Sequence, residues 1–503
     1  MSLFTGLLVI AAFPNDIAHF PELPWAIWIA FVPMLGAAAM SRTAKEAFLC
    51  GYLSGVVGHA GVLYWLISFG PIPVISLSLM YSVVFGMTAL CAWLAFRRAS
   101  PASWWWMIPV CAVALTVIEA LGTWGFPWLL PAYALSYEPL FIQLADIGGV
   151  SLVGFSVYLV NVAIYQALFH PGDSRLRIRA GVICAAAFAL ILGYGYFSLS
   201  RSFEGQKLSV ALVQGGLESD VEWTSNYSAR ARETYVRATD LGIGSARPDL
   251  VVWPESTTGE LTDPAVNLSI APLIRSVATR HGACLLFGSI TKRNGAYYNS
   301  AVLLNERGRI EAVRDKIAVV PFGEALPFRR AIQILPYPWG EQDIDAGRSL
   351  EPLSFPLSRR RAGEARYAKI ATGVCFDSIF PYIPREQVRR GGQAIAVITN
   401  NSWYKLPSGT VQHSMMDAFR AVENRRFLLR CATTGISQVI DPAGIVIKET
   451  RPLSPGFISE SIALLEGQTV YTRLGEWFGW LCVAIALVAF TWLCCVGEME
   501  GFL

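Results

Sequence analysis

A series of apolar stretches opens the chain, and most of the clear ones are close to the ~20 residues that an α-helix needs to cross a lipid bilayer. In the first 200 residues the clear stretches are 22–40, 47–68, 72–96, 103–122, 140–169 and 180–199. A shorter run covers 3–13, and a last stretch covers 475–496. We therefore predict a membrane domain of about seven transmembrane helices over residues 1–200 and one C-terminal transmembrane helix.

The composition supports a membrane protein and argues against several other classes. Charged residues make up 15% of the chain and hydrophobic residues 54%, whereas soluble domains carry about 25% charged residues. The net charge of +3 is too small to indicate nucleic-acid binding. The ten cysteines and five histidines show neither metal-ligand spacing nor the density of a disulfide framework. We expect no metal, no cofactor and no nucleic-acid partner.

The basic residues between the apolar stretches fall on alternate loops. They are Arg42, Lys45, Arg97, Arg98, Arg175, Arg177 and Arg179. The intervening loops, 14–21, 69–71 and 123–139, contain neither Lys nor Arg. Because basic loops stay in the cytoplasm, the polar part of the chain after residue 200 is expected on the opposite side of the membrane, whether or not 3–13 spans.

This exported part, residues 205–470, has the pattern of an α/β domain. β-rich runs recur at 207–214, 249–255, 284–290, 367–376 and 393–400. Helix-like stretches lie between them at 225–242, 271–282 and 412–426. Strands that alternate with helices predict a layered α/β fold.

Three strand ends of this domain carry reactive side chains, Glu255, Lys316 and Cys375. Taken singly, each has an ordinary explanation as a solvated carboxylate, a surface charge and a small buried residue. Together they supply what a cysteine nucleophile requires, which is a base for the thiol proton and a cation for the oxyanion. A neighbouring lysine would also lower the pKa of the thiol. The combination predicts an enzyme that works by covalent catalysis.

The motifs around these residues resemble the Glu-Lys-Cys signature of the nitrilase (carbon–nitrogen hydrolase) superfamily. They are W-P-E-S (253–256), D-K (315–316), V-P-F-G-E (320–324) and G-V-C-F-D (373–377). Further motifs narrow the resemblance to apolipoprotein N-acyltransferase, the membrane-embedded branch. They are G-F-P-W (125–128), V-Q-G (213–215) with Trp223, Y-N-S (298–300), Q-H (412–413) with Arg420, Ala421, Glu423 and Arg426, and Y-T-R (471–473). The resemblance covers essentially the whole chain and implies a four-layer, nitrilase-like αββα sandwich.

The resemblance implies a phospholipid:apolipoprotein N-acyltransferase in the bacterial inner membrane, with a periplasmic catalytic domain. Glu255 would activate Cys375 to attack the acyl ester of a membrane phospholipid, while Lys316 and the backbone N–H of Phe376 hold the oxyanion. The resulting thioester would pass its acyl group to a diacylated apolipoprotein. The acceptor is the α-amine of the N-terminal diacylglyceryl-cysteine, and the transfer is the last step of lipoprotein maturation.

The same resemblance assigns supporting roles to other residues. Glu324 would orient Lys316 or the incoming amine, unless it only makes a structural hydrogen bond. Residues expected to line the acyl or headgroup pocket, or else to be ordinary membrane-interface anchors, are Trp223, Asn299, Trp403 and Tyr404. Phe376 and Asp377 border the site where the family usually has Tyr and Glu, and 400–405 departs from the family's N-D-x-W-F-G. These departures bear on substrate preference.

Three alternatives stay open at the level of sequence. A membrane-tethered, nitrilase-type amidase or hydrolase would use the same three residues and let water resolve the thioester. An N-acyltransferase with a different amine acceptor is suggested by Asp377 and Asn401. A transporter or scaffold without activity is the third. The membrane anchor argues against the first, since a soluble amide needs none, and the intact Glu255, Lys316 and Cys375 argue against the third.

Overall fold

The computed structural model describes residues 1–98, 107–122, 126–169, 174–217, 225–257, 260–262, 272–326, 343–357 and 363–500. The chain forms two compact units. The first comprises Met1–Arg201, Tyr404–Met415 and Leu474–Leu503, and the second comprises Ser202–Trp403 and Met416–Arg473. The first is built from helices, and the second from two β-sheets with helices on their outer faces.

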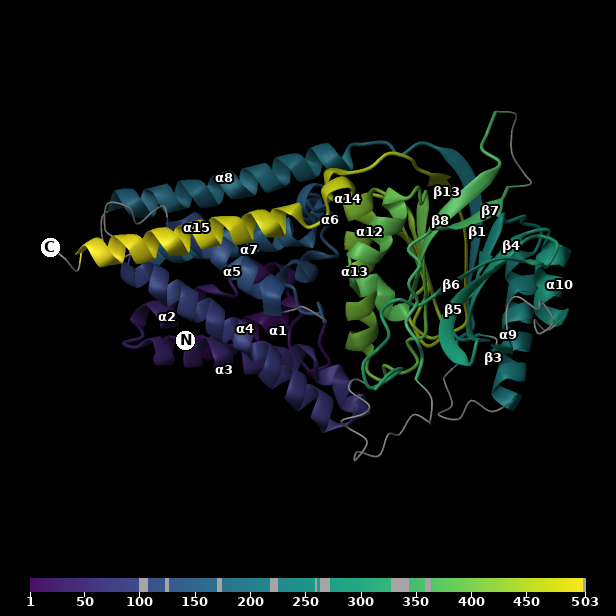
Figure 1. The fold of residues 1–503 in the computed structure, drawn as a ribbon, viewed down its shortest axis with the longest axis horizontal. Helices are drawn as coiled ribbons and strands as arrows, with labels where there is room; N and C mark the ends of the chain where they lie inside the picture. The colour runs from purple at the N-terminus through teal and green to yellow at the C-terminus, as the bar shows by residue number, and fades with distance from the viewer. Residues whose placement is uncertain are drawn as a thin grey trace. The chain divides into compact units, whose positions relative to one another are not determined.

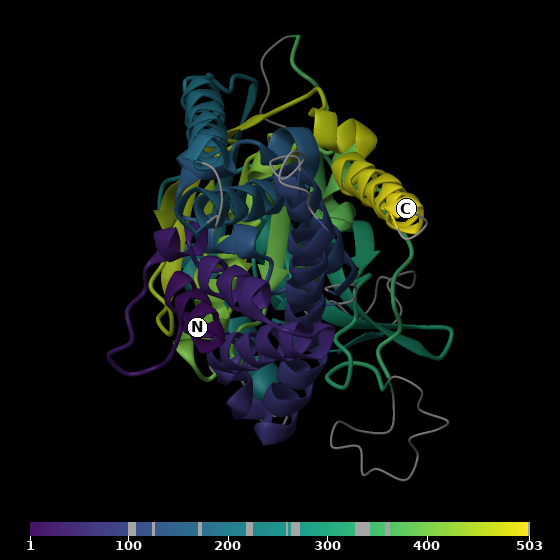
Figure 2. The ribbon, with the colours of Figure 1, turned by 90° about the vertical axis from the view of Figure 1, so that its left-hand side faces the viewer.

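The helices of the first unit can be followed in Figures 1 and 2, where the N-terminal ones are purple and blue and the last one is yellow. They are α1 (Ser2–Ala12), η1 (Pro24–Trp28), α2 (Val32–Met40), α3 (Ala44–Val62), η2 (Tyr64–Phe69), α4 (Pro71–Arg98), α5 (Met107–Gly122), η4 (Pro131–Leu135), α6 (Pro139–Ile142), α7 (Ala145–Phe169), α8 (Ser174–Leu199) and α15 (Trp477–Glu500).

Among the residues that the structure describes, three helices are long and apolar enough to cross a membrane. They cover Pro71–Arg97, Ala145–Phe169 and Ser174–Leu199. Shorter apolar helices within the described part of the chain are Ser2–Ala12, Pro24–Met40, Met107–Ala120 and Trp477–Ala489. Most of α8 is exposed, including the large apolar side chains of Val182, Leu190 and Phe197, as suits a surface that faces lipid. The number of crossings, about seven in the N-terminal part, stays a prediction.

Several apolar stretches that look continuous in the sequence are divided in the structure. Residues 22–40 form the short helix η1 and then α2, and a proline stands in the first turn of each. Proline is favoured there because the first turn needs no N–H donor. The stretch 140–169 is divided by a kink at Gly148 and Gly149, where Gly149 has φ 68°. Hydropathy does not register these breaks, since apolar and small residues predominate on both sides of them.

Helices α3 and α4 pack closely because α3 carries glycines at the contact. A Cβ atom on Gly51 would lie 2.3 Å from the carbonyl oxygen of Phe85. A Cβ atom on Gly55 would lie 2.9 Å from the Cα atom of Ser82. Small residues allow such backbone approach between membrane helices, where close packing replaces the hydrophobic effect as the source of association.

Gln412 is a buried hydrogen-bonding centre of the first unit. Its Oε1 atom accepts the indole N–H groups of Trp65, at 3.0 Å, and of Trp128, at 2.7 Å. Its Nε2 atom donates to the carbonyl oxygens of Pro14, at 2.7 Å, and of Val62, at 2.9 Å. The amide is thus fully satisfied, and it ties helix α13 (Pro407–Asn424), which begins in this unit, to segments from the start of the chain.

The second unit contains two mixed sheets. In sheet order, the first has β13 (Gly456–Leu464), β1 (Gln206–Gln214), β2 (Leu250–Val252), β4 (Cys284–Arg293), β5 (Ala296–Leu304) and β6 (Ile310–Asp315), with β3 (Glu260–Thr262) beside β4. The second has β12 (Val446–Glu449), β11 (Gln438–Ile440), β10 (Leu428–Ala432), β9 (Ala394–Thr399), β8 (Tyr367–Val374) and β7 (Leu353–Pro356). Parallel strands form the centre of each sheet, and antiparallel strands flank them.

Three apolar layers show that this unit is a four-layer sandwich (Figure 1). The central core lies between the two sheets and includes Leu212 and Ile398. Helices α9 (Ser225–Ile243) and α10 (Pro272–His281) cover the outer face of the first sheet. Helix α12 (Tyr382–Arg389) and the second half of α13 cover the second sheet. The order helix, sheet, sheet, helix confirms the predicted αββα architecture.

Candidate active site

The three predicted catalytic residues come from strands that end at the same edge of the sandwich. Lys316 directly follows β6, Cys375 directly follows β8, and Glu255 lies shortly after β2. Strands β2 and β4 are parallel. Strand β5 is antiparallel to both β4 and β6, so β6 runs in the same direction as β2 and β4. The carboxyl ends of strands are where α/β proteins build their sites. The topology therefore brings these side chains together from segments far apart in sequence.

Two carboxylates share one ammonium group at this edge. The Nζ atom of Lys316 lies 2.8 Å from Oε1 of Glu324 and 3.5 Å from Oε1 of Glu255. Asn299 donates from Nδ2 to both carboxylates, at 2.6 Å to Glu255 and 2.8 Å to Glu324. The backbone N–H of Asn400 donates to the other oxygen of Glu255, at 2.7 Å. Since Lys316 and Glu255 are buried, these bonds fix both side chains before any substrate arrives.

Cys375 stands at a strained turn between β8 and the short helix η6 (Cys375–Ile379), with φ 51°. Positive φ is uncommon outside glycine and occurs at sites where the surroundings hold the backbone in place. Here Asp377 does so, because one carboxylate oxygen accepts the N–H of Val374 at 3.0 Å. The other oxygen accepts the N–H groups of Ile317, at 3.0 Å, and Ala318, at 2.7 Å. One buried side chain thus joins the cysteine turn to the segment after the lysine.

Burial raises the pKa of the Cys375 thiol to about 12, and the negative charge of Glu255 adds to the increase. Lys316 acts in the opposite direction but is outweighed. The predicted direction of the lysine's effect is thus confirmed, and the net increase comes from burial and from the two carboxylates beside one ammonium group. The pKa of Lys316 itself is raised well above its usual value, since the charges of Glu324 and Glu255 outweigh the opposing effect of burial.

These features define what the site can do chemically. The thiol is neutral at physiological pH and needs a base in order to react, and Glu255 is a fixed carboxylate whose charge reaches the sulfur. Lys316 keeps its proton and can stabilise a developing oxyanion. Within the described ranges, no group of three or more His, Cys, Asp or Glu side chains is arranged to hold a metal ion.

Comparison with known proteins gives the family. Residues 5–163 match the model of the apolipoprotein N-acyltransferase N-terminal domain, and residues 209–469 match the carbon-nitrogen hydrolase model. An apolipoprotein N-acyltransferase of Geobacter metallireducens is 31% identical over 97% of this chain and 94% of its own length. The chain belongs to the apolipoprotein N-acyltransferase family. With its long apolar helices, it is a membrane protein.

Other members and more distant proteins are also similar. The apolipoprotein N-acyltransferase of Gloeobacter violaceus is 30% identical over 93% of this chain and 90% of its own length. Among solved structures, Saccharomyces cerevisiae Nit3, a member of branch 10 of the nitrilase superfamily, shares 17% identity. That match covers 55% of this chain and 95% of Nit3, with a TM-score of 0.39.

The structure distributes the remaining predicted site residues unevenly. Glu324 and Asn299 belong to the buried network, and Asp377 supports the cysteine turn. Phe376 is buried beside the nucleophile, and its ring packs against Phe380 at 5.3 Å between centroids. These four residues are thus built into the edge where Glu255, Lys316 and Cys375 meet.

Of the three other residues predicted to line the site, the structure describes two. Trp403 is partly exposed in the turn that follows β9. Tyr404 belongs to the first unit, where its ring packs against Trp65 at 4.7 Å between centroids. Trp223 lies outside the described residues.

Sequence reasoning missed two residues of the site, Thr399 and Asn400. Thr399 is the last residue of β9, and Asn400 directly follows it. Strand β9 is the parallel neighbour of β8, the strand that Cys375 follows. Asn400 contributes through its backbone N–H, which no side-chain motif reveals. A usable signal was present all the same, because the apolar run Ala394–Ile398 ends abruptly in the polar residues Thr399 and Asn400.

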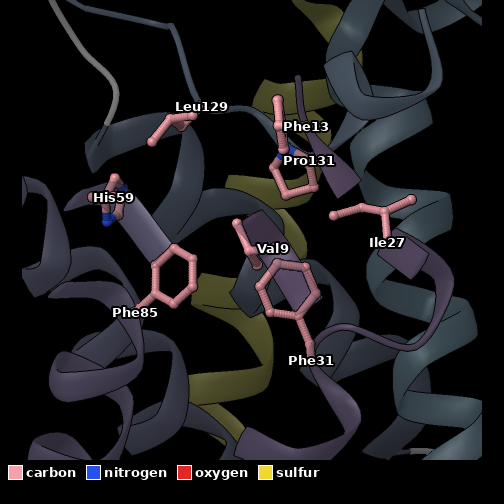
Figure 3. Close-up of a pocket in the computed structure, with 8 residues that line it drawn as sticks. All are labelled: Val9, Phe13, Ile27, Phe31, His59, Phe85, Leu129 and Pro131. Atoms are coloured by element: carbon pink, nitrogen blue, oxygen red, sulfur yellow. The ribbon is translucent and has the colours of Figure 1, made fainter. Parts of the chain in front are cut away.

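A separate pocket lies inside the first unit (Figure 3). Its walls are the apolar side chains of Val9, Phe13, Ile27, Phe31, Phe85, Leu129 and Pro131, together with His59. The ring nitrogen Nδ1 of His59 is bonded to the carbonyl oxygen of Gly55 at 2.8 Å. This pocket offers neither a thiol nor a carboxylate, so it lacks the groups that acyl transfer through cysteine requires.

Proposed function

We propose that this protein is a phospholipid:apolipoprotein N-acyltransferase that carries the acyl group on Cys375. The observation that carries the proposal is the assembly of Glu255, Lys316 and Glu324 around that thiol in a member of this family. The relatives from Geobacter metallireducens and Gloeobacter violaceus are both named apolipoprotein N-acyltransferase, and both match nearly the full length of this chain. The names of these relatives favour the acyltransferase over the alternative of a hydrolase.

In the first step the Cys375 sulfur attacks the acyl carbonyl carbon of a membrane phospholipid. Glu255 takes the thiol proton, and the new S–C bond forms as the carbonyl oxygen gains negative charge. Lys316, with the backbone N–H of Phe376, stabilises this oxyanion; a donor of this kind contributes about 3–4 kcal/mol in comparable sites. The ester C–O bond then breaks, the proton on Glu255 passes to the departing alkoxide, and a lysophospholipid leaves.

In the second step the α-amine of a diacylated apolipoprotein attacks the thioester. A C–N bond forms and the C–S bond breaks. Glu255 removes the proton that the amine nitrogen loses and returns it to the thiolate, which restores the starting site. A thioester is a suitable carrier because it reacts readily with amines while the enclosed site limits the access of water.

A thiol with a raised pKa suits this two-step exchange. A thiol of low pKa, charged before the substrate binds, would attack the ester readily. It would also leave readily when the lysophospholipid attacks the thioester in the reverse reaction. A neutral thiol that is deprotonated only during attack separates the two roles, and the carboxylate beside it supplies the base in both directions. The raised pKa therefore supports general-base activation by Glu255 rather than a preformed ion pair.

The cellular arrangement follows from the same proposal. Residues 1–200 form the N-terminal membrane domain, and 475–496 form a last transmembrane helix in the bacterial inner membrane. Residues 205–470 form the periplasmic catalytic domain. Both substrates, the phospholipid donor and the apolipoprotein acceptor, are held in the bilayer, so an anchored enzyme meets them by lateral diffusion.

The test is a transfer assay with full-length protein in detergent micelles that contain phosphatidylethanolamine and a diacylated lipopeptide. We expect N-acylated lipopeptide, and we expect none from Cys375→Ala. The matched control is Cys284→Ala, which removes another buried cysteine of the same core and should leave transfer intact. Release of free fatty acid without N-acylated peptide would replace the proposal with a hydrolase.

A further inference from the structure

Thr399 lies beside the nucleophile although it comes from a different strand. Strands β8 and β9 are parallel, and Val374 pairs with Ile398 in their register. The next position in this register brings Cys375, which directly follows β8, beside Thr399, which is the last residue of β9. The two residues therefore lie side by side at the carboxyl edge of the sheet. The Thr399 side chain is fully buried. Its backbone is also fixed, because its carbonyl oxygen accepts the N–H of Thr433 at 3.1 Å.

The hydroxyl of Thr399 is an enclosed donor with no completed hydrogen bond. Among the residues that the structure describes, no partner reaches its Oγ1 atom in hydrogen-bond geometry. Leaving a buried hydroxyl unsatisfied is unfavourable, and most buried polar groups avoid it. Such exceptions call for a functional explanation, and here the nearest reactive group is the Cys375 thiol.

We propose that Thr399 is a further catalytic residue, whose hydroxyl donates a hydrogen bond to the Cys375 sulfur when that sulfur becomes a thiolate. The inference rests on the proposed function of Cys375 as the nucleophile. A neutral thiol is a weak acceptor, whereas a thiolate is a strong one. The bond is therefore stronger in the charged state, and it favours that state selectively, as catalysis requires.

The proton inventory stays simple in this scheme. The thiol proton goes to the Glu255 carboxylate, and the Thr399 hydroxyl keeps its own proton throughout. The same bond serves twice, once when the thiolate forms in acyl-enzyme formation and again when the thiolate departs in aminolysis. A nearby Thr399 hydroxyl also acts to lower the pKa of Cys375, against the larger effects of burial and of Glu255.

The experiment compares Thr399→Val, which has the same shape without the hydroxyl, with Thr399→Ser, which keeps the hydroxyl. The first measurement is the rate of Cys375 alkylation by iodoacetamide between pH 7 and 10 in the folded, full-length protein. We expect Thr399→Val to react at least about tenfold more slowly than the parent at each pH, equivalent to a rise of ~1 unit in the thiol pKa. Thr399→Ser should stay within about twofold of the parent.

The second measurement is acyl transfer from phosphatidylethanolamine to a diacylated lipopeptide. We expect a lower kcat for Thr399→Val, with KM for the phospholipid unchanged, and recovery in Thr399→Ser. Should Thr399→Val fail to fold, Thr399→Ala also lacks the hydroxyl and takes its place. Parent-like alkylation and kcat in the variant without a hydroxyl would overturn the inference. Alkylation needs no acyl chemistry, so it tests Thr399 even if the parent transfers no acyl group, an outcome that would count against the proposed function instead.

Discussion

Two clusters of buried charge in the second unit differ in one respect that separates chemistry from architecture. At the catalytic edge, Glu255 and Glu324 share the single ammonium group of Lys316. Behind it, Asp417 of α13 is paired one to one with Arg430 of β10, at 2.6 Å, and both side chains are fully buried. The first cluster carries an excess of negative charge beside a thiol, whereas the second is neutral.

The difference shows how similar residues acquire different roles. A balanced buried pair has its charges compensated and has nothing left to offer a substrate. The unbalanced cluster keeps a carboxylate that is held in place but not neutralised, and this is what a general base needs. We expect substitutions in the first cluster to change rates, and substitutions in the second to change the free energy of unfolding.

The largest expected effect is that of Glu255→Gln. Loss of the base should reduce acyl transfer by about a thousandfold or more. The same substitution removes a negative charge that raises the pKa of Cys375, so the thiol should be alkylated faster than in the parent at pH 8. The measurements are transfer rate and alkylation rate in one preparation. Glu449→Gln, at an exposed position of β12, is the control, and equal losses in both assays would contradict the assignment.

Lys316→Met comes next. Removal of the ammonium group should lower transfer by ~10²–10³-fold, because the oxyanion loses a preorganised donor. It also leaves Glu255 and Glu324 without their cation, which raises the thiol pKa further and slows alkylation. Lys369→Met, at an exposed position of β8, should be nearly silent in both assays. Transfer within about threefold of the parent would show that the oxyanion is held by other groups.

Arg430→Met tests the other side of the comparison. It removes the ion-pair partner of the buried Asp417, and breaking a buried pair in this way typically costs about 3–5 kcal/mol of folding stability. Burial already raises the pKa of Asp417 and Arg430 opposes that effect, so the variant should also take up a proton there. Transfer per folded molecule should fall far less than in Lys316→Met.

The control for this comparison is Lys448→Met, which breaks the more exposed pair with Glu460 at 3.0 Å. Exposed pairs contribute about 0–1 kcal/mol, so the unfolding transition should barely move. Denaturant unfolding of the full-length protein in detergent measures both variants. A turnover defect in Arg430→Met without a loss of stability would erase the distinction between the two clusters.

The smallest expected effect concerns how the alkylation rate of Cys375 depends on pH. Because the pKa of Cys375 is raised to about 12, the thiolate fraction below that pH grows tenfold with each pH unit. The alkylation rate of Cys375 should therefore rise continuously from pH 7 to pH 10. A plateau below pH 8 would mean a preformed thiolate, and with it a site in which Lys316 rather than burial sets the charge.

Much of this site could be predicted from the sequence because its chemistry lies in side chains at strand ends. Glu255 and Cys375 each follow a largely apolar strand, Lys316 follows the mixed strand Ile310–Asp315, and the edge where these strands end is a property of the topology. Glu324 and Asn299 could be placed near them through motifs, although their bonds to Glu255 and Lys316 could not.

Other features could not be derived in that way. The contribution of Asn400 is a backbone N–H, and that of Asp377 is a set of three bonds to backbone N–H groups. A backbone N–H has no side-chain signature, and the motif that contains Asp377 does not show which groups its carboxylate contacts. The net pKa of Cys375 depends on burial and on the number of neighbouring carboxylates, which spacing does not show. In the first unit, the break at Gly149 lies within a stretch of predominantly apolar residues.

The most direct test of the central claim is mass spectrometry of the protein after incubation with phosphatidylethanolamine micelles in the absence of an acceptor. The account predicts one acyl group in thioester linkage on the peptide that contains Cys375, and its loss when a diacylated lipopeptide is added. An unmodified Cys375, or an acyl group on another residue that persists in Cys375→Ser, would contradict it.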